Sequence, residues 1–403
     1  MYALTSICVY VVYARQVEDG ISVVVQPSTS RIFSDKEYQA AGALISNDLT
    51  SSQVILGVKQ VPAHELIEGK TYMFFSHTIK GQEDNMPLLQ ACLDKKVRLV
   101  DYECITAGGK VNGKRLIAFG AWAGRAGMIN GLRGLGERLL AQGYSTPFLN
   151  MASSYMYSSF EEARRGVLQV GESLRKHGLP PDLAPLVVVF TSNGKASRGA
   201  QEVFELLPHQ WVHPSELATL PPDRGHLFGC VVEAQDYITH RQGAPFDRQD
   251  YYAHGATMYE STFRSNIAAY ATAIVNCTYW DDRYPRLLTK QDLKEMHLQH
   301  NRKLALVADI SCDVGGSIEF LDKSTPVEKP FYLYNPVKGR VEDSLDGDGV
   351  VMMGVDILPS ELPREASTHF GDLLVCVCVR AHTHTNTHTC VRAATEQAMQ
   401  SAC

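Results

Sequence analysis

The chain has 403 residues, of which 45% are hydrophobic and 20% are charged, and its formal net charge at pH 7 is −6. This length allows a large buried core and predicts two domains, while the mild acidity offers no basic surface for nucleic acid or an anionic membrane. No apolar run approaches the roughly 20 residues of a membrane-spanning helix. Its ten scattered cysteines include no C-x-x-C pair and predict reduced intracellular thiols, with no metal site expected.

Residues 20–120 alternate short apolar runs with amphipathic segments, which is typical of a parallel sheet with helices on its faces. Helices are predicted within SDKEYQAAGALI, opened by the N-cap Ser34, and within NMPLLQACLDKK. Strands are predicted within ISVVVQPS, at Val54–Val58, at Tyr72–Phe75, and within VRLVDYE and RLIAFG.

Two of these predicted strands end close to a basic, proton-carrying residue, Lys59 after the first and His77 after the second. Because ligands bind at the carboxyl ends of parallel strands, we expect the two residues to face one pocket as an acid/base pair. We expect Lys80, Asp101 and Glu103 close by. A solvated lysine and a histidine that fills a polar gap are the alternative interpretation.

A second α/β region follows a glycine-rich helix, AGRAGMINGLRGLGERLLAQG, whose glycines predict close packing against another backbone at a domain or subunit boundary. The segment LVVVFTSNGKASRGAQEVFELL reads as strand, turn and helix, where a dinucleotide's pyrophosphate can bind. The glycine spacing departs from G-x-G-x-x-G, and a plain turn is the competing interpretation. The candidate cofactor contacts in this turn are Ser192, Asn193, Gly194, Ser197, Arg198 and Gly199.

Two further features bear on the cofactor. Near Trp211–Ser215 no carboxylate stands at the strand tip to bind a ribose diol, which mildly favours NADP over NAD, and Arg198 could meet a phosphate. In VADISCDVGGSIEF an apolar strand ends at Asp309, and Asp313 and two glycines follow. These carboxylates could contact the nicotinamide ribose or orient a catalytic base, although a turn-capping aspartate is equally compatible.

The last part of the chain changes character. Residues 346–374 read as a return of the chain to the first domain. Beyond them, VCVCVRAHTHTNTHTC alternates Val-Cys and His-Thr, as translated dinucleotide repeats do. We therefore expect residues 375–403 to form a disordered tail.

The motifs GVKQVP, FFSHTIKGQ, AFGAWAGRAGMIN, LLTKQDL, ADISCDVGGSIEF and LPSELPREAS together resemble the lysine–2-oxoglutarate reductase half of the alpha-aminoadipic semialdehyde synthase family. More distantly, residues 20–374 resemble saccharopine and alanine dehydrogenases. The resemblance implies an α/β fold of two Rossmann-like domains with parallel sheets and an interdomain cleft. It assigns residues 1–120 plus 346–374 to a substrate domain and 121–345 to a dinucleotide-binding domain.

By this resemblance Lys59 and His77 are the catalytic pair, and Asp313 matches the aspartate of the D-Q-G-G motif of alanine dehydrogenases. The implied reaction is the NADPH-dependent condensation of L-lysine with 2-oxoglutarate to saccharopine, by a mitochondrial enzyme that could be a homo-oligomer. The candidate substrate contacts are Lys80, Glu103 and Arg364, of which Lys80 and Arg364 are basic residues that a substrate with two carboxylates needs.

Two alternatives stay open. Met1–Glu18 lacks the arginine-rich stretch that the family carries there, and no clear transit peptide is recognised, so a truncated isoform that binds nucleotide without catalysis is one alternative. An alanine-dehydrogenase-like enzyme that acts on a single amino acid is the other.

Overall fold

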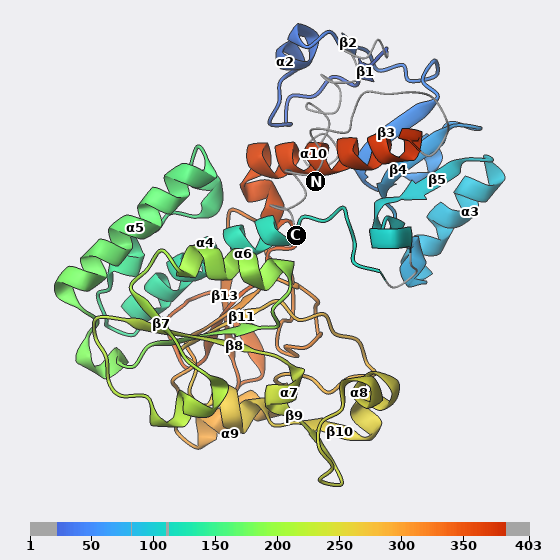
Figure 1. Cartoon of the computed structure of the whole chain (residues 1–403). Helices are drawn as coiled ribbons and strands as arrows, with labels where there is room; N and C mark the ends of the chain where they lie inside the picture. The colour runs from blue at the N-terminus through green and yellow to red at the C-terminus, as the bar shows by residue number, and fades with distance from the viewer. Residues whose placement is uncertain (1–21, 82, 110–112, 384–403) are drawn as a thin grey trace. The chain divides into compact units, whose positions relative to one another are not determined.

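The computed structural model describes residues 22–81, 83–109 and 113–383 (Figure 1). The predictions for Met1–Glu18 and for residues 384–403 lie outside the described residues. The chain divides into two compact units, the first made of Met1–Phe119 with Pro363–Cys403 and the second of Gly120–Leu362. Each unit is described by itself.

The first unit contains a three-stranded parallel sheet in the order β3-β4-β5 and a separate parallel pair, β1-β2. Ser34 caps the helix between β1 and β2 through a capping box with Glu37, as the sequence predicted. The elements of this unit are β1 (Val24–Val25), α2 (Asp35–Ala40), β2 (Leu44–Ile45), β3 (Val54–Lys59), β4 (Thr71–Phe75), α3 (Met86–Asp94), β5 (Arg98–Asp101) and α10 (Pro363–Thr383).

The predicted strand RLIAFG does not form, and its backbone makes only an isolated bridge between Arg115 and Thr106. The apolar side chains of this segment serve the core instead of a sheet. Ile117 is fully buried, and the ring of Phe119 stacks on Phe370 of α10 at 5.1 Å between centroids. Helix α10 therefore completes the core of the first unit and continues to Thr383, so the prediction of a disordered tail from residue 375 is wrong for residues 375–383.

The second unit is built on an eight-stranded sheet in the order β14-β13-β15-β12-β11-β6-β8-β7, in which β13 runs antiparallel to both of its neighbours. A small antiparallel pair, β9-β10, lies outside this sheet. The strands are β6 (Val187–Thr191), β7 (His209–Trp211), β8 (Leu227–Val232), β9 (Ile238–His240), β10 (Tyr259–Ser261), β11 (Ala273–Asn276), β12 (Leu306–Asp309), β13 (Phe331–Asn335), β14 (Arg340–Glu342) and β15 (Val350–Met353).

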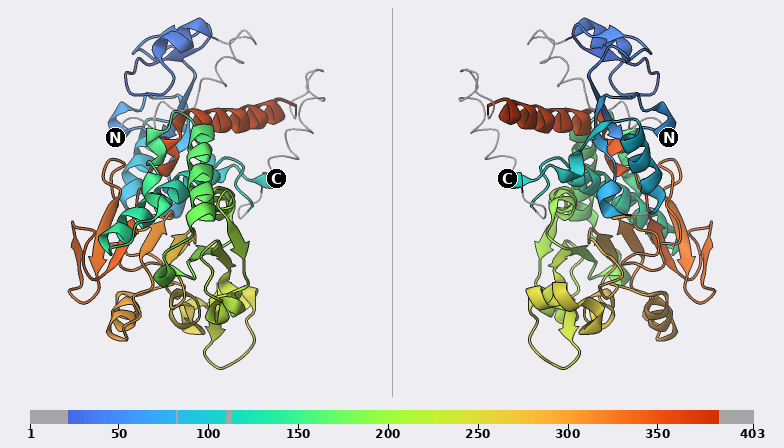
Figure 2. Two further views of the ribbon diagram at one scale, coloured as in Figure 1. Left: turned by 90° about the vertical axis from the view of Figure 1, so that its left-hand side faces the viewer. Right: turned by 90° about the vertical axis from the view of Figure 1, so that its right-hand side faces the viewer.

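Helices cover both faces of this large sheet, with α4, α5 and α6 on one face and α9 on the other (Figures 1 and 2). The strands β15, β12, β11, β6 and β8 are almost entirely buried, as expected of a sheet covered on both sides, whereas the edge strand β7 is not. The helices are α4 (Gly120–Ala141), α5 (Phe160–His177), α6 (Lys195–Phe204), α7 (Ala234–Tyr237), α8 (Arg248–His254) and α9 (Lys290–Leu298).

The return of the chain to the first unit occurs at Pro363 and not at residue 346 as predicted. Residues 346–362 stay in the second unit because β15 pairs with β12 on one side and β13 on the other. An apolar run such as Val350–Met353 looks the same in either sheet, so its sequence did not show which one it joins.

The glycines of α4 allow very close packing against α6 within the second unit. A Cβ added at Gly124 would lie 1.9 Å from the backbone oxygen of Ala196, and one at Gly199 would lie 2.2 Å from the oxygen of Ala121. Close backbone packing was predicted correctly. The partner of these two glycines, however, is a helix of the same unit and not a domain or subunit boundary.

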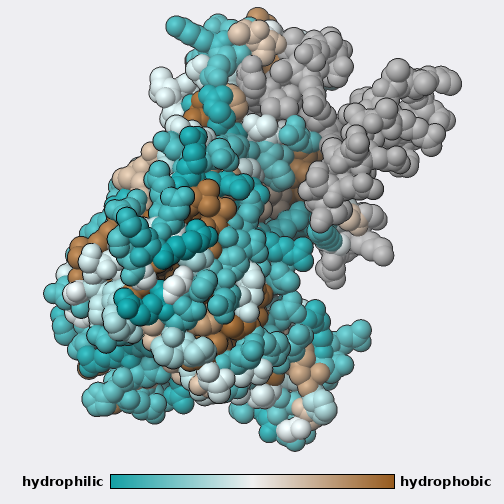
Figure 3. Space-filling view, turned by 60° about the vertical axis from the view of Figure 1, so that its left-hand side comes forward, coloured by the Kyte–Doolittle hydropathy of each residue, from teal (hydrophilic) through white to brown (hydrophobic). Residues whose placement is uncertain are grey.

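The face shown in Figure 3 is mostly hydrophilic with small separate apolar patches. None of the helices within the described ranges is long and apolar enough to cross a membrane.

Candidate active site

Lys59 and His77 leave neighbouring parallel strands at the same edge of the first unit's sheet. Lys59 is the last residue of β3, and its Cα partner across the ladder is Phe75, the last residue of β4. His77 follows two residues beyond Phe75. The Lys59 side chain is exposed, and that of His77 is 37% exposed. The sequence therefore placed both groups at the correct edge.

A buried carboxylate orients the His77 imidazole. Nδ1 of His77 lies 3.0 Å from Oε2 of Glu103, whose side chain is only 2% exposed, and Nη1 of Arg115 lies 3.0 Å from the other carboxylate oxygen. A protonated Nδ1 that donates to Glu103 leaves Nε2 as the atom able to exchange a proton with a substrate. Glu103 therefore positions His77, and its contact with a substrate stays a prediction.

The backbone at His77 is held in a conformation that few non-glycine residues adopt. Its φ is +57°, in the left-handed region, which costs roughly 1–2 kcal/mol for an L-residue. The buried Asp101 carboxylate stabilises this turn, because it accepts hydrogen bonds from the Ser76 hydroxyl and from the Glu103 backbone N–H at 2.8 Å. Strain held in place by such a network is typical of functional sites.

The other two predicted substrate contacts, Lys80 and Arg364, also belong to the first unit. Lys80 ends a short 3-10 turn, Thr78–Lys80, that follows His77. Arg364 at the start of α10 donates to the Glu37 carboxylate at 3.2 Å and lies over the ring of Phe33. Its guanidinium is thus partly engaged within the first unit, and its contact with a substrate stays a prediction.

In the second unit, a hydrogen-bonded polar network joins the carboxyl ends of β6, β11 and β12. Asn276 ends β11; its amide oxygen accepts from the Thr191 hydroxyl at 2.9 Å, and its amide nitrogen donates to Asp309 at 3.0 Å and to Ser317 at 2.9 Å. The sequence indicated Asp309 but not Asn276 or Thr191. The sequence does contain a signal for all three, because each is a polar residue that ends an apolar strand.

Within this network, the Asp309 carboxyl has a raised pKa. It is 1% exposed, burial raises the pKa of its carboxyl to about 6, and Oδ2 has no hydrogen-bond partner among the described residues. The other oxygen accepts from Ser311 at 2.6 Å and from the backbone N–H of Cys312 at 3.1 Å. One buried oxygen is therefore left for a proton or a ligand.

We expect Asp309 to make stability depend on pH. Because its folded-state pKa is raised, its contribution is fully present below about pH 4, the unfolded value, and is lost as the pH rises through about 6. The loss is about 3 kcal/mol, since one pKa unit corresponds to about 1.4 kcal/mol. Urea unfolding between pH 4 and 7 should show this slope in the native chain and not in Asp309→Asn. An equal slope in both proteins would refute it.

The turn between β6 and α6 presents backbone rather than side chains. Ser192 has a φ of +65°, and Gly194 caps α6 without any side-chain hydrogen bond to the helix. A Cβ added at Gly194 would meet only the Ser192 hydroxyl, at 3.9 Å. An open, uncapped helix N-terminus at this place suits a phosphate group.

Not all predicted contacts in this turn face outward. Ser197 is fully buried and accepts a hydrogen bond from Gln201 at 2.9 Å, and Gly199 packs against α4. Arg198 is exposed, and its guanidinium approaches the Asn193 side chain at 3.4 Å. Ser192, Asn193, Gly194 and Arg198 therefore remain candidate phosphate contacts, while Ser197 and Gly199 have structural roles.

Asp313 lies in the tight turn that follows β12. Its backbone oxygen accepts from the Gly316 N–H at 2.8 Å, and Arg286 contacts the carbonyl groups of Gly315 and Gly316. Asp313 is exposed on a fixed turn, as a cofactor contact would be. It belongs to the second unit, so its predicted convergence with Lys59 and His77 in one cleft stays a prediction.

The strand beside β6 is β8, and a carboxylate follows it directly. Glu233 succeeds the last residue of β8, and its Oε2 accepts from Arg248 at 3.2 Å. β7, which ends at Trp211, is the edge strand beyond β8. The expectation concerned β7, and the carboxylate that follows β8, the neighbour of β6, is a further candidate for the ribose contact.

The fold agrees with comparisons to known proteins. Residues 12–126 match the family model described as alanine dehydrogenase/PNT, N-terminal domain. An L-alanine dehydrogenase structure superposes with a TM-score of 0.52 at 15% identity, covering 98% of this chain and 96% of that one. A transhydrogenase from Sinorhizobium meliloti gives 0.50 at 15% identity, covering 91% and 87%. These likenesses confirm the predicted α/β fold with parallel sheets.

Sequence relatives narrow the assignment. The chain is 44% identical over 382 residues to alpha-aminoadipic semialdehyde synthase of Arabidopsis thaliana, covering 91% of this chain and 35% of the relative. It is 40% identical over 372 residues to the mitochondrial enzyme of the same name from Mus musculus, covering 88% and 40%. The chain is similar to the lysine–ketoglutarate reductase region of these proteins and spans 35–40% of the length of the two relatives. The predicted resemblance is confirmed.

Proposed function

We propose that the chain catalyses the NADPH-dependent reductive condensation of L-lysine with 2-oxoglutarate to saccharopine. The observation that carries the proposal is the 44% identity over 91% of the chain to a semialdehyde synthase. The Lys59, His77 and Glu103 arrangement supports it, because it supplies proton-transfer groups where the parallel strands end. A mitochondrial location is proposed from the name of the mouse relative.

The reaction joins the ε-amino nitrogen of lysine to the keto carbon of 2-oxoglutarate, releases water and reduces the resulting C=N bond. Release of water requires a proton on the departing oxygen, which His77 can deliver from Nε2 while Glu103 stabilises the charged imidazole. The Lys59 ammonium can donate a hydrogen bond to the keto oxygen and polarise it for attack. These two side chains would thus promote condensation.

The second unit fits a nicotinamide dinucleotide. The uncapped start of α6 and the open space at Gly194 suit the pyrophosphate, and the sheet order changes direction beside β6, where dinucleotides bind in such folds. When bound, the cofactor supplies the hydride that reduces the C=N bond. Ser192–Gly194 would hold its phosphates, and Asp313 would lie near its nicotinamide end.

We propose NADPH over NADH on the resemblance and on Arg248. The Arg248 guanidinium neutralises Glu233, and if Glu233 marks the ribose position, a 2′-phosphate would meet a cation there rather than a bare carboxylate. Since both side chains are partly exposed, the pair can open when a ligand arrives.

Arg248 should favour the binding of NADPH, and Glu233 should favour the binding of NADH. Arg248→Gln should weaken NADPH binding about tenfold and leave NADH nearly unchanged, while Glu233→Gln should weaken NADH binding, by losing the diol acceptor. Fluorescence titration of each nucleotide measures both effects. Arg241→Gln, which removes an exposed arginine paired with Glu260, is the matched control. Equal losses for the two nucleotides in Arg248→Gln would contradict the assignment.

A steady-state assay of NADPH absorbance tests the function as a whole. Oxidation of NADPH should require L-lysine and 2-oxoglutarate together, and saccharopine should appear by mass spectrometry. NADPH binding without turnover would favour the alternative of a catalytically impaired isoform. Oxidation of NADPH with a single keto acid and ammonia, or reduction of NADP+ with a single amino acid, would favour an alanine-dehydrogenase-like activity.

A further inference from the structure

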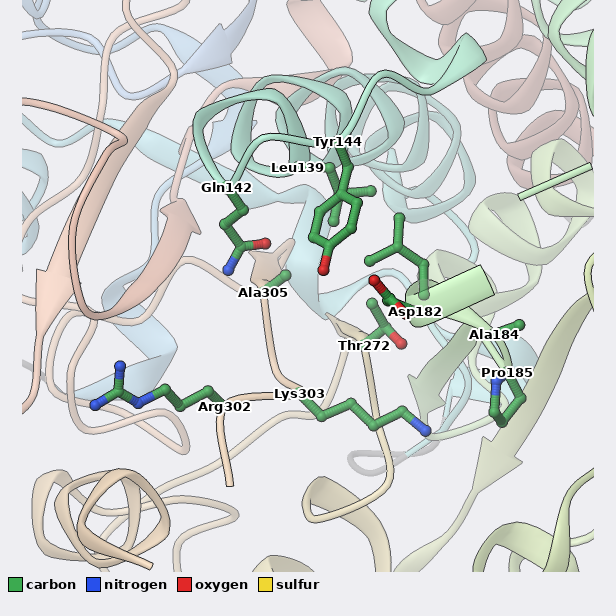
Figure 4. A pocket seen from close by; sticks show the side chains of 11 residues that line it. Leu139, Gln142, Tyr144, Asp182, Ala184, Pro185, Thr272, Arg302, Lys303 and Ala305 are labelled. Carbon is green, nitrogen blue, oxygen red and sulfur yellow. The ribbon is translucent and has the colours of Figure 1, made fainter. Parts of the chain in front are cut away.

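A cavity of about 570 Å³ opens in the second unit at the amino ends of its parallel strands, the edge opposite to the phosphate turn (Figure 4). Pro185 precedes β6, Thr272 precedes β11, and Ala305 precedes β12, and all three line it. The volume lies within the range typical of small-molecule sites. The proposed function uses none of its residues.

Two opposite charges line this cavity without pairing. Lys303 lies half-buried ahead of β12, and Asp182 enters from the 3-10 turn Pro181–Leu183. Neither side chain forms an ion pair or hydrogen bond with another of the described residues. Arg302, beside Lys303, instead pairs with Asp348 at 2.6 Å. In Figure 4, Thr272 lies between Asp182 and the Lys303 ammonium, and the Tyr144 hydroxyl points toward the same space.

The Lys303 ammonium has lost water without gaining a counter-ion. Burial lowers the pKa of this group, and no neighbouring charge offsets the effect. A carboxylate from outside the chain would supply the missing charge-assisted hydrogen bond. A simple anion, however, would also face the Asp182 carboxylate, whereas a ligand with its own ammonium would satisfy both groups.

We propose that this cavity binds a free amino acid, with its α-carboxylate on Lys303 and its α-ammonium on Asp182. The hydroxyl groups of Thr272 and Tyr144 and the amide of Gln142 provide further polar contacts along the wall. The site lies at the sheet edge away from the candidate cofactor turn, so it is a second site and does not depend on the proposed reaction.

Competitive acetylation tests the site at Lys303 itself. Trace acetic anhydride transfers an acetyl group to neutral lysine amines, with release of acetate, and peptide mass spectrometry reads each lysine separately. Glycine, the smallest amino acid, should protect Lys303, and at ten times its dissociation constant labelling should fall about tenfold. Lys294, exposed on α9, is the internal control and should be labelled equally with and without glycine.

Acetate and methylamine separate the two charges of the ligand. At the glycine concentration that protects Lys303, neither should protect it, because each satisfies only one wall of the cavity. Asp182→Asn should remove protection by glycine, and Asp282→Asn, which alters another exposed aspartate, should retain it. Protection by acetate as strong as that by glycine, no protection by glycine, or glycine protection that persists in Asp182→Asn would overturn the proposal. Failure of saccharopine formation would not change these readouts.

Discussion

His77→Asn and Lys59→Met should each lower turnover of lysine and 2-oxoglutarate roughly 10²–10⁴-fold, the usual scale for losing general acid/base assistance. Asparagine is the better replacement for His77, because it tolerates the left-handed backbone at φ +57° while removing the titratable imidazole. Nucleotide binding should be nearly unchanged in both variants, since the candidate phosphate turn lies in the second unit.

His64→Gln provides the matched control for this experiment. Its imidazole lies in the same unit, is 81% exposed and contacts only the neighbouring Glu65 among the described ion pairs. Steady-state kinetics with NADPH absorbance would compare the three variants with the native chain. Native turnover in both His77→Asn and Lys59→Met would remove these residues from the mechanism.

Gly124→Ala should destabilise the second unit by about 3 kcal/mol or more, despite the higher helix propensity of alanine. The added Cβ would lie 1.9 Å from the backbone oxygen of Ala196 and 2.8 Å from the backbone nitrogen of Ala200, and backbone cannot move aside as a flexible side chain can. Denaturant unfolding, read as the free energy of unfolding, measures the effect.

Gly131→Ala is the control on the same helix. Its Cβ would come no closer than 3.3 Å to the Ala308 Cβ, so stability should change by about 1 kcal/mol or less. A comparable loss in the two variants would show that the close approach of α4 and α6 does not limit substitution at Gly124.

Local sequence patterns predicted β3 and β4 and the sheet edge at which Lys59 and His77 lie. The apolar runs ending before Lys59 and at Phe75 became β3 and β4, and parallel pairing then brought Lys59 and His77 to one edge. Arg115 could not be predicted as a partner of Glu103, because its segment reads as a strand and its apolar neighbours instead fill the core.

The order of the strands in the second unit's sheet was harder to predict from the sequence than the strands themselves. Consecutive strands are usually neighbours, so the ribose contact was sought after β7, but β8 lies between β7 and β6 and makes Glu233 a further candidate for that contact. The return of the chain to the first unit was predicted at residue 346 instead of Pro363 for the same reason, because the sequence does not show which strands Val350–Met353 pairs with. The identity of an apolar strand is visible in its residues, while its place in a sheet depends on packing between distant segments.

The division of the chain also has a consequence for synthesis on the ribosome. The second unit is continuous from Gly120 to Leu362, whereas the core of the first needs Phe370 and Leu374 of α10. The first unit must therefore wait for 243 residues, from 120 to 362, before its last core side chains emerge. At about 5–20 residues per second this delay is roughly 10–50 s, during which the second unit can fold while the first exposes Tyr102 and Phe75 to chaperones.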